Sequence, residues 1–153
     1  MRKKKVRVDS KHTVTSTTKE RVLRWALVRI LLKTPVREVM FRGNRVSLTF
    51  FGQRISDRIR IKREDHVADW SRRRKEIFID KRITVADRKK SFQALCVHEV
   101  VEKFMVEKFG LRLDEEAHVV ATQKEKEYLQ HHGGNWRSHE LIIYWDWHRM
   151  GEH

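Results

Sequence analysis

One predicted helix carries two polar residues in a stripe that is otherwise apolar, and this feature constrains the fold most. Steps of three and four along the helix connect Leu95, His98, Glu102, Met105 and Phe109. His98 and Glu102 are four residues apart, so their side chains leave the same face. Because burying an unpaired carboxylate is costly, Glu102 needs a cation, a network of donors or a metal ion beside it.

A second predicted helix follows after a short break. Gly110 suits the position just after a helix end, and Asp114 offers an N-cap for the next helix. One stripe of this second helix carries His118, Ala121 and Glu125. If the helix turns back on the first, the stripe lies against the polar pair. The spacing therefore favours a metal site, and a purely structural polar cluster is the alternative.

The motifs in these two helices resemble those of a known group of proteins. They read His98-Glu99-x-x-Glu102, then Gly110-Leu111, then Glu116-Ala117-His118-x-x-Ala121-x-x-x-Glu125. This combination is similar to the small zincin-like proteins of prokaryotes and their viruses, which have an HExxE motif and a downstream AHxxA motif. The match covers about residues 76–130. The resemblance implies one Zn²⁺ per chain, held by His98, Glu102 and His118, with Glu99 as the general base.

The third ligand is open on geometry alone. A strict antiparallel hairpin would set Glu125 opposite His98 and leave His118 near Met105, whereas a steep crossing would bring His118 to the metal. We predict His118 as the ligand, because zinc favours imidazole and the resemblance agrees. Glu125 is then expected to support a ligand histidine from behind. An oxygen-rich iron or manganese site that includes Glu115 is the weaker alternative, because di-iron bundles need two Glu-x-x-His pairs.

The positive charge of the chain is confined to its first half. The net charge is +14, and residues 1–63 hold 19 Lys or Arg against 4 Asp or Glu, a balance of +15. We expect residues 1–11 to form a disordered basic arm with Arg2, Lys3, Lys4, Lys5 and Arg7. A strand after residue 52 would expose Arg54, Arg58, Arg60 and Lys62 on one face. Both groups are candidate contacts to DNA or RNA.

The remaining pattern indicates an α+β fold. A capping box at Thr17 and Glu20 opens a helix to about Lys33, and a short helical turn is expected over residues 36–41. Alternating residues predict strands at 46–51 and 54–62, a short strand is expected at 76–80, and residues 64–75 read as loop or exposed helix. Thr84 is the expected N-cap of the motif helix, and a final amphipathic helix follows Trp136.

These elements predict one α+β domain over residues 12–153, with a small antiparallel or mixed sheet, a metal-binding helix pair at about 76–130, and N- and C-terminal helices. The strand at 76–80 is either the substrate-binding edge that zincin-like peptidases use or an ordinary core strand.

The lone cysteine, Cys96, and the lack of a long apolar run indicate a cytoplasmic protein without a membrane partner. Its 37% of charged residues lean towards a thermophile.

The expected function is a zinc metallohydrolase that acts on a peptide or protein substrate, with a basic half that binds nucleic acid. The alternative is a non-enzymatic nucleic-acid-binding protein whose cluster is structural.

Overall fold

In its described residues, the chain folds into a five-stranded mixed sheet with four α-helices, an α+β architecture. The computed structural model describes residues 17–62, 67–83 and 88–150, and in the last segment it describes side chains as far as residue 144. The strands are β1 (Val36–Arg42), β2 (Arg45–Phe50), β3 (Gln53–Lys62), β4 (Ala68–Trp70) and β5 (Glu76–Asp80). The helices are α2 (Thr18–Lys33), α3 (Lys89–Phe109), α4 (His118–His131) and α5 (Trp136–Met150).

The strands are ordered β1-β2-β3-β5-β4, so β1 and β4 form the two edges of the sheet. The β1–β2, β2–β3 and β4–β5 pairs are antiparallel, and β3 and β5 run parallel. A two-residue loop at Phe51 and Gly52 joins β2 to β3, with φ of 50° and 73°. Positive φ at both positions is the hairpin geometry that matches the twist of the flanking strands.

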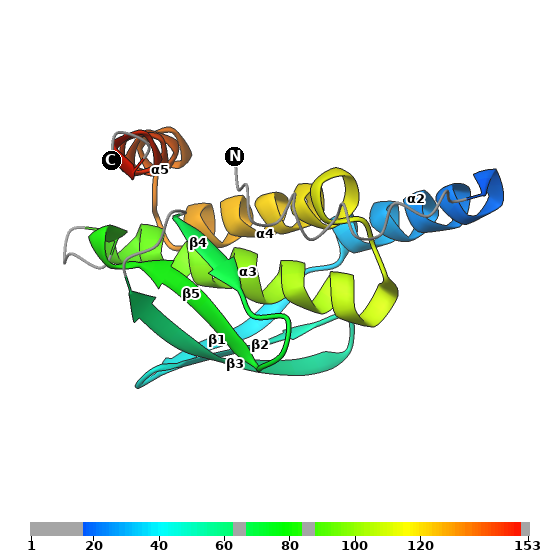
Figure 1. Ribbon diagram of the computed structural model, residues 1–153, viewed down its shortest axis with the longest axis horizontal. Helices are drawn as coiled ribbons and strands as arrows, with labels where there is room; N and C mark the ends of the chain where they lie inside the picture. The colour runs from blue at the N-terminus through cyan, green and yellow to red at the C-terminus, as the bar shows by residue number, and fades with distance from the viewer. Residues whose placement is uncertain (1–16, 63–66, 84–87, 151–153) are drawn as a thin grey trace.

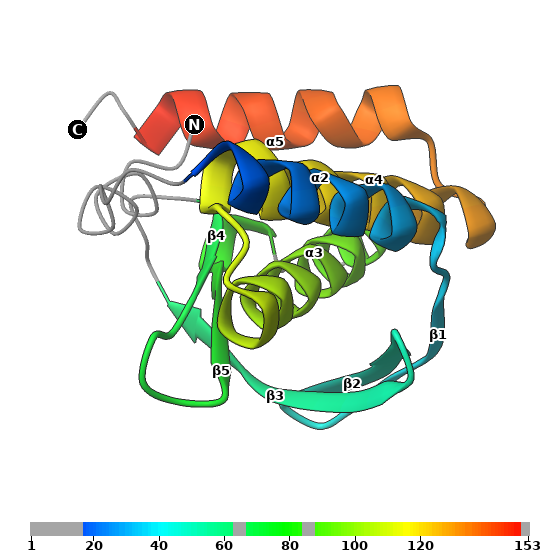
Figure 2. The same cartoon turned by 90° about the vertical axis from the view of Figure 1, so that its right-hand side faces the viewer.

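The helices are stacked in layers on one side of this sheet (Figures 1 and 2). Figure 2 shows α3 against the concave side of the sheet, with α2 and α4 above α3 and α5 beyond them. The capping box at Thr17 and Glu20 is present at the start of α2, as predicted. None of the helices in the described ranges combines the length and apolarity needed to cross a bilayer.

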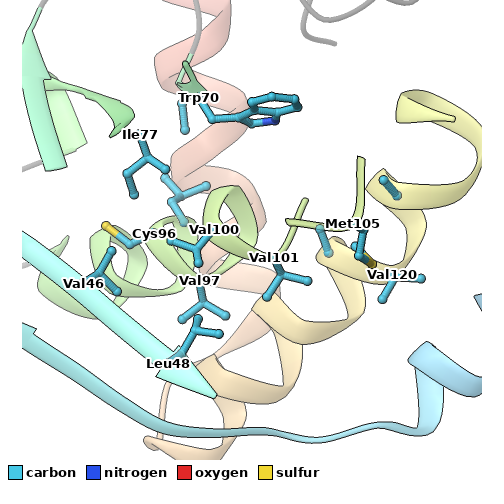
Figure 3. Close-up of a cluster of buried hydrophobic side chains, with 14 of the residues drawn as sticks. Val46, Leu48, Trp70, Ile77, Cys96, Val97, Val100, Val101, Met105 and Val120 are labelled. Atoms are coloured by element: carbon cyan, nitrogen blue, oxygen red, sulfur yellow. The ribbon is translucent and has the colours of Figure 1, made fainter. Parts of the chain in front are cut away.

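The main helix, α3, is buried on two sides. Val97 and Val100 lie over Leu48 and Ile77 of the sheet, whereas Met105 points towards Val120 of α4 (Figure 3). Every residue from Ala94 to Lys103 is buried. One side of α3 therefore closes the hydrophobic core on the sheet, and the other side brings the predicted polar stripe against α4.

The helical turn expected at residues 36–41 is wrong, because this segment is the edge strand β1. Val36 pairs with Phe50 and Phe41 pairs with Val46, so both face the core. Two residues five apart leave opposite faces of a regular strand, but a register shift between Arg37 and Met40 returns Phe41 to the inner face. This bulge hid the alternation that identifies a strand in sequence.

Three further expectations have different outcomes. Within residues 64–75, the described part contains the short buried strand β4 rather than a loop or exposed helix. The strand at 76–80 is β5, which lies inside the sheet between β3 and β4, so of its two alternatives the ordinary core strand is confirmed and the substrate-binding edge is wrong. The expected N-cap at Thr84 lies outside the described residues, and the observed N-cap of α3 is Arg88, whose side chain makes no capping hydrogen bond.

The second motif helix begins differently from the prediction. It opens with a π-helical turn, η4 (Leu113–Ala117), whose N-cap is Arg112 rather than Asp114. The reason is Glu116, whose buried carboxylate accepts the backbone N–H of Arg112 at 2.7 Å. Glu116 also accepts from the Nε atom of Arg24 at 3.0 Å, and this contact ties α2 to the start of the second motif helix.

Candidate metal centre

Two helices bring together the three residues that were predicted to be metal ligands. His98 and Glu102 come from α3, and His118 is the first residue of α4. One potential ligand atom from each lies within 4.8 Å of the other two. Glu102 Oε2 is 3.2 Å from His98 Nε2 and 2.9 Å from His118 Nδ1. Ligands about 2.0–2.1 Å from a tetrahedral zinc ion are separated by about 3.3 Å, so small adjustments would open this cluster around a metal.

A tryptophan from the sheet fixes the carboxylate at the centre of the cluster. Trp70, in the edge strand β4, donates its indole N–H to Glu102 Oε1 at 3.0 Å. Both Trp70 and Glu102 are buried. One oxygen of Glu102 is therefore held by the indole, and the other faces the two imidazoles.

His98 lies between two carboxylates, and this position requires a positive charge in the site. Its Nδ1 atom is 2.7 Å from Glu125 Oε1, and its Nε2 atom faces Glu102 Oε2. An ionised carboxylate only accepts hydrogen bonds, and neutral histidine has one donor and one acceptor nitrogen. With Nδ1–H given to Glu125, a positive charge is required between Nε2 and Glu102. Either a second proton or a metal ion supplies it.

Glu125 connects the cluster to a histidine that has no spacing signal in the sequence. Its Oε2 atom contacts Nε2 of His139, a residue of α5 that is 2% exposed. Burial alone would raise the pKa of Glu125, but the hydrogen bonds from His139 and His98 hold this pKa well below its usual value. Glu125 therefore stays ionised, which suits a carboxylate that orients a ligand histidine from behind.

The predicted general base lies beside the same histidine nitrogen. Glu99 is fully buried, and its Oε2 atom is 3.9 Å from His98 Nε2. His118 is the partly exposed member of the cluster, with 41% of its side chain accessible. Solvent therefore contacts the cluster at His118, whereas Glu99 and Glu102 are fully buried.

The two geometries weighed for the third ligand turn out to be compatible. Glu125 is opposite His98, as a hairpin requires, and His118 nevertheless reaches Glu102. Residues 118 and 125 are two turns apart on α4, so one helix face serves both contacts. Glu115, the residue of the oxygen-rich alternative, points elsewhere: its side chain is 62% exposed and 3.7 Å from Arg112 Nε.

The residues predicted to contact nucleic acid have mixed placements. Those of the N-terminal arm, Arg2 to Arg7, lie outside the described residues. Arg54, Arg58, Arg60 and Lys62 all lie in β3 and are exposed. Arg54 donates to the Glu38 carbonyl and the Thr49 hydroxyl, so its guanidinium holds the β1 bulge in place.

Comparison with known protein families, curated proteins and solved structures finds no match to this chain.

Proposed function

We propose that this chain is a zinc-dependent hydrolase that acts on peptide or protein substrates. The observation that carries the proposal is the position of His98, whose two nitrogens each face a buried carboxylate. A metal ion between His98, Glu102 and His118 would supply the positive charge that this geometry needs. Two imidazoles and one carboxylate are a common ligand set for catalytic zinc, and they leave a fourth position open.

The side chains around the ion would then have separate roles. A zinc ion at this position would supply a Lewis acid that lowers the pKa of a water molecule towards neutrality. Glu99 would accept a proton from that water and deliver it to the leaving group. Trp70 would keep Glu102 in its orientation, and Glu125 would keep the Nε2 lone pair of His98 directed at the metal.

The sheet edge favours an extended peptide as the substrate. β4 is an edge strand, and its Trp70 donates to the central carboxylate. Ala68, Asp69 and Trp70 are buried in the unbound chain, so the peptide would have to displace what covers β4 before adding to its edge by backbone hydrogen bonds. The edge beside the site is therefore β4, and not the strand at 76–80 that the sequence offered.

Substitution of Glu99 tests the proposal. We expect Glu99→Gln to keep zinc and to lose hydrolysis of a casein or peptide panel, because the amide cannot accept the proton. Glu115→Gln is the matched control, since this nearby acid points into solvent. Loss of zinc in Glu99→Gln would make Glu99 part of the structure rather than the base. A zinc-loaded wild-type protein that cleaves no peptide, ester or amide would favour the structural alternative.

A further inference from the structure

The outer face of the sheet carries a row of three arginines across adjacent strands. Buried and exposed residues alternate along β2, and Arg45 belongs to the set that points away from the core. Arg45 pairs with Arg42 of β1 and with Arg58 of β3. Residues paired across a sheet share a face, so all three side chains leave the same surface. Each of them is exposed.

A second basic row runs parallel to the first. Thr49 of β2 pairs with Arg37 of β1 and with Arg54 of β3. The two rows are four residues apart along β2, which is about 13 Å. Ser47 and Ser56 lie between them. The outer, convex face of β1–β3 is therefore rich in arginines, with Met40, Ser47 and Ser56 between the two rows and the Glu38 carboxylate beside Thr49.

Four of these arginines are not neutralised within the described part of the chain. Arg37, Arg42, Arg45 and Arg58 have no carboxylate oxygen there within 4.0 Å of their guanidinium nitrogens. Like charges directly opposite each other destabilise a sheet, so the row of Arg42, Arg45 and Arg58 has an energetic cost. A bound polyanion would remove that cost.

The neighbouring cations are already engaged. Arg60 is 3.6 Å from the Glu76 carboxylate, and Lys62 lies over the ring of Phe78. Arg54 is committed to the β1 bulge. The available cations are thus largely different from the β3 residues that the sequence suggested.

We propose that the outer face of β1–β3 binds the phosphate backbone of a nucleic acid through Arg37, Arg42, Arg45 and Arg58. Guanidinium groups pair with phosphate in a bidentate manner, and rows of them match a regularly repeating charge. Met40 is the large apolar side chain at the outward positions of these three described strands, and a single methionine offers little apolar area for insertion into a lipid surface. This chemistry favours nucleic acid over a membrane.

The proposed surface and the metal cluster lie on opposite sides of the sheet. Figure 2 shows all four helices on the concave side, and no described element covers the other side of β1–β3. His98 and Glu102 face α4 and β4, away from the arginine rows. A nucleic acid on this surface would therefore not reach the cluster. It would tether the protein, and binding would not depend on metal.

Anisotropy titrations of the full chain test this surface, with a 20-base-pair DNA duplex, an RNA duplex and a single strand between 50 and 200 mM salt. One variant changes Arg37, Arg42, Arg45 and Arg58 to Gln. The matched control changes Lys19, Arg21, Lys108 and Arg137 to Gln, which removes the same charge from exposed helix positions. The N-terminal arm is present in both. Circular dichroism verifies that both variants fold.

We expect the surface variant to lower the slope of log K against log salt by about 3 to 4, since each phosphate contact contributes about 0.9 on duplex DNA. Because of this difference in slope, raising the salt from 50 to 200 mM should weaken the wild-type protein by about 150-fold more than the surface variant. The control variant should keep the wild-type slope, and chelator should leave binding unchanged.

Three results would overturn the assignment: equal losses in both variants, loss of binding in chelator, or no nucleic-acid binding at 50 mM salt. Binding of phosphatidylserine vesicles alone, lost in the surface variant, would replace nucleic acid by lipid as the partner.

Discussion

Substitution of Glu125 tests whether this residue supports a ligand histidine or binds the metal directly. Glu125 accepts from Nδ1 of His98 and contacts Nε2 of His139, and it lies behind the ligand atoms. Outer partners of this kind change metal affinity by about 10–100-fold, which is about 1.4 to 2.7 kcal/mol. We expect Glu125→Ala to weaken zinc binding within this range. His118→Ala should weaken it further, because that change removes a direct ligand.

The same substitution has a second consequence for the metal-free protein. Glu125→Ala leaves two buried imidazole nitrogens without their acceptor, and each unsatisfied group costs about 1–3 kcal/mol. We therefore expect the free energy of unfolding to fall by about 2–6 kcal/mol. Glu125→Gln should lose less, because its amide oxygen can still accept from His98 Nδ1–H.

Competition with a chromophoric chelator at pH 7.5 would measure the zinc affinities, and urea unfolding with chelator present would measure the stabilities. The reasoning fails if Glu125→Ala loses more zinc affinity than His118→Ala. That order would mean that two carboxylates and one imidazole hold the metal.

Three further predictions concern groups outside the cluster. Burial raises the pKa of Asp57 from 3.8 to about 6, so its stabilising contribution is complete below pH 3.8 and is lost as the pH rises through about 6. In urea unfolding, the free energy of unfolding of the wild type should fall by about 3 kcal/mol over this window, and that of Asp57→Asn should not. Parallel pH profiles of the two proteins would contradict this prediction. Arg24→Met should destabilise the fold by about 3–5 kcal/mol, since Glu116 is left buried without its cation. Adding Glu116→Gln should recover part of this loss, as measured by thermal unfolding. A Tm unchanged by Arg24→Met would refute the prediction. Cys96 is fully buried with a pKa well above its usual value, so thiol reagents should label it only after unfolding, and labelling of the native protein would be the opposite result.

Local spacing explains which parts of the site could be predicted. His98 and Glu102 are one helical turn apart, and His118 and Glu125 are two turns apart, so helix periodicity alone put each pair on one face. The polar stripe then required the two helices to pack together, and their contact agrees with this prediction.

The sequence could not predict Trp70 and His139 as parts of the site, because both reach it through tertiary contacts. Trp70 is 32 residues from Glu102, and His139 is on a different helix from Glu125. Neither has a spacing that links it to the motif. The arginine rows were missed for a related reason: Arg42, Arg45 and Arg58 come together only through strand register, and the bulge in β1 disguised the first of these strands.

The zinc content of the purified protein tests the central claim most directly. We expect about one zinc ion per chain by elemental analysis, lost in His98→Ala and in His118→Ala. His132→Ala, which changes an exposed histidine just beyond the end of α4, should retain the metal. Wild-type protein without bound metal, and with the same Tm with and without chelator, would show that protons rather than zinc balance the buried carboxylates.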